Sequence, residues 1–293
     1  MTYLRIRSVT KADVPLITDW ARQEDFAPGR GDVGIYRQTD RQGVWVGCLG
    51  GEPIGCIAGI RYNLAYGFIG LYLVQPEHRG HGYGRELWQH ALRHLDGVAC
   101  IGLEAAPERI KDYAGWGFEE ASPTTRWRIG IGTEDTYPQA VSMPSGLRLA
   151  TGKAIPDMPL QRYDAQRELS PRPHFLADWL HHPAGSVIAL LDADQECHGF
   201  ARIRPCLLKR GEGWRIGPLL ADSEALAELL IRQLLQAHTG VVLLDSPGAN
   251  PAASGLMRRL GFEPVARTVR MYRGSMPTQD LRDVFALACL ELG

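Results

Sequence analysis

The sequence repeats itself at half length. The segment "LRIRSVTKADVPL" begins at Leu4 and "LRLATGKAIPDMPL" at Leu147, while "GFEEASPTTRW" at Gly117 corresponds to "GFEPVARTVRMY" at Gly261. The offset is 143 residues for the first pair and 144 for the second. Matching segments in one order and at nearly constant spacing indicate two diverged copies of one fold. The 293 residues are therefore predicted to form two domains, 1–135 and 145–293, joined around "TEDTYPQAVSMPSG".

Each copy shows the same order of strand and helix patterns. In copy one, two β-rich runs meet at a Gly-Gly-Glu-Pro turn, and an apolar run at 68–74 precedes a helical pattern at 85–95. A strand at 98–105 and a second helix before Trp116 follow, and copy two repeats this order from 186 to 260. Because strands precede and alternate with helices, each copy is predicted to be α/β or α+β around a central sheet.

The composition argues against several classes of protein. The formal net charge is −1, so no basic surplus indicates binding to nucleic acid or to an anionic membrane. No apolar run reaches the ~18 residues of a membrane-spanning helix, and the N-terminus lacks the apolar core of a signal peptide. The six cysteines form no Cys-x-x-Cys pair, which indicates reduced thiols rather than disulfides or a zinc site. We therefore expect a cytoplasmic protein that has no metal and binds neither nucleic acid nor a membrane.

The stretch "RGHGYG", Arg79 to Gly84, lies between the apolar run and the helical pattern. A glycine-rich turn at a helix start exposes backbone N–H groups that bind phosphate oxygens, and glycines let the phosphates approach closely. The guanidinium of Arg79 could chelate a phosphate as well. The alternative is that the three glycines only make a tight turn.

Two known nucleotide-binding loops can be compared with this stretch. The Walker pattern fails, because Gly84 is followed by Arg85 and Glu86 instead of Lys and Ser or Thr. The dinucleotide pattern G-x-G-x-x-G needs its third glycine one residue later, although Glu104 stands where a ribose-binding acid would be. Dinucleotide binding is therefore kept as an alternative.

The whole segment resembles the GCN5-related N-acetyltransferase (GNAT) family. "LYLVQPEHRGHGYG" matches the family signature through Val74, Pro76, Arg79, Gly82 and Gly84, and a second family element follows as "YAGWGF", which starts at Tyr113. The resemblance covers most of residues 1–130, and the second half looks like the C-terminal domain of tandem acetyltransferases. It implies two domains, each with a mixed, largely antiparallel sheet flanked by helices, and acetyl-coenzyme A as cosubstrate.

The resemblance also implies roles for individual residues. Main-chain groups of Leu73 and Val74 would pair with the pantetheine arm like an added strand. Tyr113 would protonate the departing thiolate, and a positioned phenol is chemically suited to that step; the alternative is an aromatic side chain packed on a helix face. The pyrophosphate would lie against the loop residues Arg79, Gly80, His81, Gly82, Tyr83, Gly84 and Arg85.

Acidic residues could bind the acceptor amine and accept its proton. Glu104, at a strand end, is the best-placed carboxylate for the proton, or else a plain charge at a strand end. Glu24 and Asp32 lie in "RQEDFAPGRGD", where this family usually contacts its acceptor, or else belong to a solvated loop. One position departs from the family, since Ala106 stands where an asparagine is frequent.

Copy two lacks the residues that would carry this chemistry. Asp222 and Glu224 stand where copy one has Arg79 and the glycines, and Met257 takes the place of the tyrosine, although Asn250 is kept. Carboxylates at a helix start would repel a pyrophosphate. Copy two is therefore predicted to close the acceptor pocket or to serve as a scaffold. Arg202, Arg204 and Asp245 are candidates to face the pocket, or else are paired within their own domain.

The sequence thus predicts an acetyl-coenzyme A-dependent N-acetyltransferase for a primary amine of a small molecule. Two alternatives remain open, a non-catalytic acyl-coenzyme A binding or sensing module and a protein lysine acetyltransferase. Either a monomer or a homodimer is compatible with the tandem copies.

Overall fold

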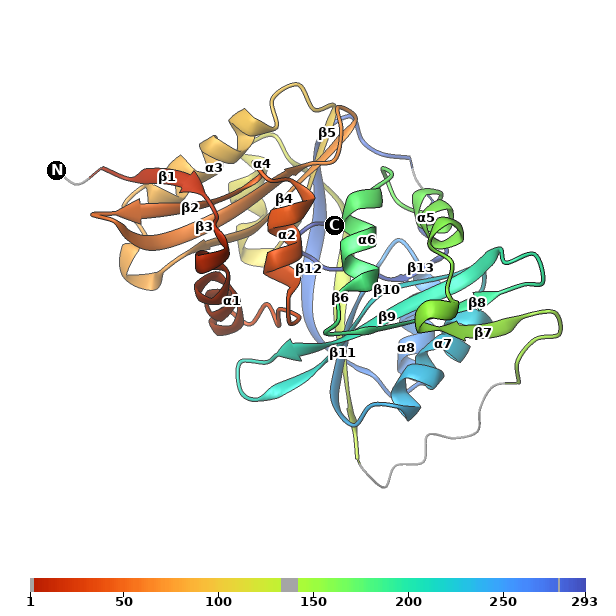
Figure 1. The fold of residues 1–293 in the computed structure, drawn as a ribbon. Coiled ribbons are helices and arrows are strands. Elements are labelled where there is room, and N and C mark those ends of the chain that lie inside the picture. The colour runs from red at the N-terminus through yellow and green to blue at the C-terminus, as the bar shows by residue number, and fades with distance from the viewer. Residues whose placement is uncertain (1–2, 133–141, 279) are drawn as a thin grey trace.

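The computed structural model describes residues 3–132, 142–278 and 280–293. Most of the predicted joint between the copies, 133–146, and the predicted domain end at 135 lie outside these residues. Figure 1 shows the first half in red to yellow and the second half in green to blue. The first half comprises β1 (Arg5–Ser8), α1 (Val14–Gln23), α2 (Asp32–Thr39), β2 (Val44–Leu49), β3 (Glu52–Arg61), β4 (Tyr66–Val74), α3 (Tyr83–His94), β5 (Cys100–Ala105), α4 (Ile110–Ala114) and β6 (Glu119–Ile131).

The second half repeats this order, which confirms the predicted α/β class. Copy-two helices and strands correspond one by one to those of copy one until β12, and β13 follows as an addition. The elements are β7 (Arg148–Thr151), α5 (Asp157–Ala165), α6 (Pro173–His181), β8 (Ser186–Leu191), β9 (Cys197–Leu207), β10 (Glu212–Ala221), α7 (Glu224–Gln236), β11 (Gly240–Pro247), α8 (Pro251–Arg259), β12 (Glu263–Gly274) and β13 (Val284–Ala286).

All of these strands belong to one sheet, and the two halves exchange a strand at its centre. The order is β1-β2-β3-β4-β5-β12-β6-β11-β10-β9-β8-β7, with β13 beside β10. β12 of the second half therefore pairs with β5 of the first, and β6 of the first half pairs with β11 of the second. In Figure 1 these two long strands run side by side between the halves. Among the described strands, only β4 with β5 and β10 with β11 pair in parallel, so the sheet is mixed and largely antiparallel.

Helices cover the sheet with apolar faces, as the periodicity predicts. Leu87, Trp88 and Ala91 of α3 are buried in one core cluster with residues of β3, β4 and β5. α7 buries Leu229, Leu230 and other apolar residues against β9 and β10 in the second half. The burial of these faces removes apolar surface from water, which is the main favourable term in folding.

The strands β4 and β5 separate at one end and leave a gap. They pair in parallel from Tyr66 with Cys100 to Ile69 with Leu103. Beyond this point Leu71 has a φ of 47°, and the β3–β4 register also shifts here. A bulge of this kind redirects a strand and ends its pairing. The backbone from Leu71 to Val74 therefore faces an open space rather than β5.

Candidate active site

A cavity of about 360 Å³ lies at the open end of β4 and β5, where the two halves meet. The first half contributes the loop after α1, the separated ends of β4 and β5, and Tyr113 of α4. The second half contributes β11, β12 and the segment after β13. From the second half, the lining residues are Asp245, Ala266, Arg267, Thr268, Leu290 and Glu291.

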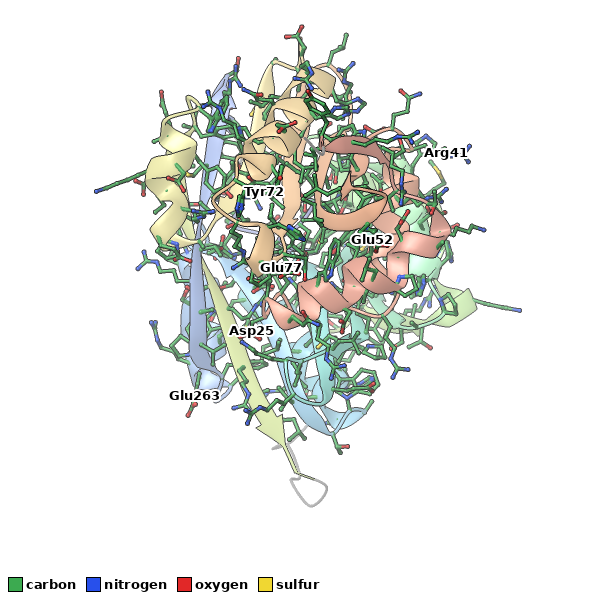
Figure 2. All side chains as sticks on the ribbon, turned by 90° about the vertical axis from the view of Figure 1, so that its left-hand side faces the viewer. Asp25, Arg41, Glu52, Tyr72, Glu77 and Glu263 are labelled. Carbon is green, nitrogen blue, oxygen red and sulfur yellow. The ribbon has the colours of Figure 1, made fainter. Side chains whose placement is uncertain are left out.

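A groove of about 650 Å³ continues from this cavity along β4 to the glycine loop. Tyr72, Tyr113, Glu24 and Glu104 line both spaces. Figure 2 shows the side of the molecule on which Tyr72 and Asp25 lie, with β6 and β12 running down past them. Of the residues expected to hold a cofactor, those that line the groove are Leu73, Val74, Arg79, Gly80, Gly82, Gly84 and Arg85.

The glycine loop has the backbone that its sequence requires. Gly80 and Gly82 have φ values of 81° and 87°, a region that other residues rarely adopt, and α3 begins directly afterwards at Tyr83. No atom lies within 4 Å of the position that a Cβ would take on either glycine. Gly84 is required for another reason, since the Tyr72 hydroxyl occupies the place of its Cβ. His81 and Tyr83 are not among the groove-lining residues; their rings stack with centroids 5.9 Å apart.

Arg79 and Glu24, which were expected to bind different ligands, bind each other. Arg79 Nη2 donates to Glu24 Oε1 at 2.6 Å, and Arg79 Nε donates to the Val74 carbonyl at 2.8 Å. Both side chains are partly exposed, so solvent screens this ion pair. The pair connects the loop after α1 to the glycine loop at the place where groove and cavity join.

Tyr113 lies at the centre of the site. Its ring packs against Trp88 with centroids 5.0 Å apart, and it lines both the cavity and the groove. Burial raises the pKa of Tyr113 to about 12, and burial also raises the pKa of the neighbouring Tyr72. Both phenols therefore carry their protons at neutral pH, and each is a potential proton donor. Tyr72 was missed by the sequence analysis, because a tyrosine in a strand carries no distinctive pattern.

Glu104 lines the cavity, but its carboxylate is already engaged. Oε1 accepts hydrogen bonds from Arg270 Nε at 2.7 Å and Thr124 Oγ1 at 3.1 Å, and Oε2 accepts one from Thr268 Oγ1 at 2.7 Å. The side chain is 2% exposed. These bonds occupy both carboxylate oxygens of Glu104. The expected role of Glu104 as the proton acceptor stays a prediction.

Asp32 does not reach the cavity, contrary to the expectation that it contacts the acceptor. Its carboxylate is fully buried and forms a two-pronged ion pair with Arg204, whose Nε lies 2.9 Å from Oδ1 and whose Nη2 lies 2.9 Å from Oδ2. The Gly29 N–H also donates to Oδ2 at 2.9 Å. Asp32 thus connects α2 to β9 of the second half instead of facing a ligand.

Of the three second-half side chains proposed for the cavity, only Asp245 is among its lining residues. Its carboxylate accepts from Arg126 Nε at 2.7 Å and from Arg215 Nη2 at 2.7 Å. Burial alone would raise its pKa, but the two guanidinium groups lower the pKa of Asp245 to about 2. Arg202 and Arg204 instead pack over the Trp179 ring, with guanidinium carbons 4.8 and 4.2 Å from its centroid.

The second copy has its own parallel pair, β10 and β11, but β13 covers the corresponding open backbone. β13 pairs with Leu219 and Leu220 of β10, which correspond to Tyr72 and Leu73 when Gly217 is aligned with Gly70. At the helix start, Ser223 caps α7 by accepting from the Leu226 N–H. In copy two, the Ser223 cap therefore stands where copy one has the glycine loop, and β13 pairs with the strand edge that is open in copy one.

Several residues of the segment 287–293 were missed by sequence reasoning. After β13, the chain runs back to the first half, and Figure 1 shows its end near the centre of the molecule, close to α2 and α6. The Glu291 carbonyl occupies the place of a Cβ on Gly70, and the Ala288 carbonyl lies 2.7 Å from that place on Gly217. No periodicity or motif in "LACLELG" predicts this course.

Within residues 3–132, 142–278 and 280–293, no group of three or more His, Cys, Asp or Glu side chains could hold a metal ion. No helix in the same residues is long and apolar enough to cross a membrane. All six cysteines are buried and unpaired.

Comparison with known proteins agrees with the two-copy architecture. One family model, "Acetyltransferase (GNAT) family", matches residues 14–118, and another, "Acetyltransferase (GNAT) domain", matches residues 160–286. Holothin acyltransferase from Pseudoalteromonas sp. (strain SANK 73390) is 30% identical over 280 residues, which cover 95% of this chain and 90% of that protein.

Solved structures share the fold over nearly the full length. An acetyltransferase candidate from Pyrococcus horikoshii superposes with a TM-score of 0.79 at 21% identity, covering 99% of this chain and 96% of that one. A tandem GNAT protein from the clavulanic acid biosynthesis pathway superposes with a TM-score of 0.67 at 17% identity, covering 94% and 100%.

Proposed function

Because this chain belongs to the acetyltransferase (GNAT) family and is an acyltransferase, we propose that it transfers an acetyl group from acetyl-coenzyme A to a primary amine of a small molecule. The observation that carries the proposal is the continuous path from the glycine loop, along the open edge of β4, to Tyr113 and the cavity. Acetyl-coenzyme A supplies the thioester that is attacked.

The groove fits the two polar parts of such a cosubstrate. Gly80 and Gly82 lie in open space at the start of α3, where backbone N–H groups and the helix dipole favour a pyrophosphate. The backbone of Leu73 and Val74 faces the groove, where an amide-containing arm can pair with it like a strand. The Val74 carbonyl is taken by Arg79, so Arg79 has to release it if the arm uses that acceptor.

Tyr113 is the proposed general acid. A phenol with a pKa near 12 keeps its proton until a stronger base appears beside it. A free thiolate is a weaker base than this phenolate. Tyr113 can therefore act as the acid only if its proton moves to the sulfur as the C–S bond breaks, which requires the hydroxyl to lie next to the sulfur. Glu104 then acts by position: its bonds to Thr268 and Arg270 hold β12 of the second half against β5.

A small acceptor is favoured over a protein lysine by the shape of the site. The cavity has walls from both halves and a volume of about 360 Å³, which is within the usual range for a small-molecule site. A second groove, of about 490 Å³, shares Asp25, Arg126 and Ala266 with the cavity and provides a route for the acceptor. The related holothin acyltransferase is, by its name, an acyltransferase for holothin.

The experiment that tests the function is the release of free coenzyme A thiol from acetyl-coenzyme A in the presence of a panel of small amines. Amine-dependent release is expected, with the acetylated amine identified by mass spectrometry. Tight acetyl-coenzyme A binding without release for any amine would favour the sensing module, and acetylation of protein lysines alone would favour the lysine acetyltransferase.

One acetyl-coenzyme A is expected to bind per chain. Copy one has the open strand edge and the glycine loop, whereas β13 occupies the matching edge in copy two. Calorimetric titration of the full chain should therefore give a stoichiometry of one. Two sites per chain would contradict the assignment of β13 as the element that fills the second site.

The variant Gly82→Asp is expected to abolish acetyl-coenzyme A binding. The backbone of Gly82 has a positive φ that aspartate rarely adopts, and a carboxylate there would repel the phosphates. The matched control is Ser223→Asp at the start of α7, where aspartate caps a helix as well as serine does. The control should bind acetyl-coenzyme A with unchanged affinity.

A further inference from the structure

The segment 287–293 is held in place at both of its ends. The Leu287 N–H donates to the Asp245 carbonyl at 2.9 Å. At the other end, the Tyr62 hydroxyl donates to the Leu292 carbonyl and Arg172 Nη1 donates to the Gly293 carbonyl, both at 3.0 Å. Glu291, between these anchors, is therefore a fixed part of the cavity wall.

Most carboxylates that line the cavity already have a cation or lie at its exposed rim. Glu24 is paired with Arg79, Glu104 with Arg270, and Asp245 with Arg126 and Arg215. The exposed carboxylates at the rim are Asp25 and Glu108.

Glu291 is the least firmly paired of the buried lining carboxylates among the described residues, because its ion pair with Arg215 is long and has no hydrogen bond. Its side chain is 5% exposed, and Oε2 accepts from the Tyr36 hydroxyl at 3.1 Å. Oε1 accepts no hydrogen bond from the residues that the structure describes; Arg215 Nη1 lies 3.7 Å away, beyond hydrogen-bond length. The guanidinium of Arg215 donates instead to Asp245 and to the carbonyls of the loop after α1.

A buried carboxylate in a cavity wall, with one oxygen that accepts no hydrogen bond, can take a further cationic donor. We propose that Glu291 binds the ammonium group of the acceptor through Oε1 and accepts its proton. This inference rests on the proposed function, because it assigns the amine end of the acceptor to one wall of the cavity. The acceptor class is therefore an aliphatic amine that is charged at neutral pH.

The protons of the proposed acetyl transfer balance without a further reactant. One proton passes from the ammonium to Glu291, the N–C bond forms as the C–S bond breaks, and the sulfur takes the proton of the Tyr113 hydroxyl. The second nitrogen proton then replaces the one lost by Tyr113, and Glu291 releases its proton to solvent. Each turnover thus yields an amide, a thiol and one proton.

The test uses Glu291→Gln in the full chain, with two acceptors. Glutamine keeps the shape and the hydrogen-bonding capacity toward Tyr36 but cannot take a proton. For an aliphatic amine, kcat/KM should fall by roughly 10²-fold or more at pH 7, which is the range for losing a general base. For an aromatic amine, which is neutral at pH 7, the loss should be much smaller, and the KM for acetyl-coenzyme A should not change.

The pH profile adds a readout that packing alone would not alter. The variant depends on amine that is already neutral in solution, so its kcat/KM for the aliphatic amine should rise about tenfold per pH unit below the pKa of the amine. Glu52→Gln, the same change on an exposed turn far along β3, is the matched control and should behave as wild type. If Glu291→Gln folds poorly, Glu291→Asp should fold and keep the preference for the aliphatic amine.

Equal losses for both acceptors, or no loss, would overturn the assignment of Glu291 while leaving the proposed function standing. A wild-type chain that acetylates no amine at all would overturn the proposed function, and this inference with it.

Discussion

Replacing Tyr113 by phenylalanine is expected to lower kcat by roughly 10²–10⁴-fold, the range for loss of a general acid. The ring should stay in place, because phenylalanine keeps the ring that packs against Trp88. The affinity for acetyl-coenzyme A should be nearly unchanged, because the glycine loop and the β4 edge are untouched. Single-turnover kinetics at saturating amine would measure the chemical step, and calorimetry would measure the cofactor affinity.

Tyr72 provides the sharpest comparison for this experiment. It is the other partly buried phenol in the groove, but its hydroxyl lies against Gly84 at the start of α3, in the direction expected for the phosphates. Tyr72→Phe should therefore affect cofactor binding more than the chemical step, and Tyr3→Phe on the surface should affect neither. If Tyr72→Phe lost the chemical step and Tyr113→Phe kept it, the general acid would be Tyr72.

Two arginines on one face of β9 are expected to have opposite effects on stability. Arg204 neutralises the fully buried Asp32, so Arg204→Met would leave a buried charge without its partner. Breaking a buried pair in this way typically costs about 3–5 kcal/mol. The loss should be measured as a lower urea midpoint of unfolding, and it should be accompanied by looser contact between the halves, because Asp32 and Arg204 belong to different halves.

Arg202 is the matched counterpart, two residues away. Its three guanidinium nitrogens have no hydrogen-bond partner among the described residues, and its side chain is fully buried. Burial and the neighbouring Arg204 lower the pKa of Arg202 to about 9, which leaves it charged at neutral pH. Arg202→Met should be neutral or should raise the free energy of unfolding by about 1–4 kcal/mol. A destabilisation as large as that of Arg204→Met would show that Arg202 has a partner.

The parts of the fold that follow from local patterns could be predicted from the sequence. The glycines at 80 and 82 indicate backbone with positive φ, and the spacing of apolar residues in α3 predicts a helix with one buried face. The strand exchange could not be predicted, because β6 and β12 follow the same Gly-Phe-Glu turn, and either strand offers the same backbone hydrogen bonds to β5.

The chemistry of the acidic residues also depends on partners far along the chain. Glu104 is engaged by Thr268 and Arg270, 164 and 166 residues later, and Asp32 by Arg204, 172 residues later. A carboxylate looks equally available in sequence whether or not such a partner exists. For the same reason, the sequence does not identify Glu291 as a candidate site residue. Its proposed role depends on which neighbouring carboxylates are already paired in the fold.

The exchange of β6 and β12 makes the two copies inseparable. A chain with only the first copy would lack β12 beside β5, and this place could be filled only by its own β6 or by a strand from a second molecule. Duplication within one gene allows the two copies to exchange these strands within a single chain. β13 covers the strand edge of β10 in the second copy, yet deleting that copy would still remove β12 from its place beside β5, the strand that carries Glu104.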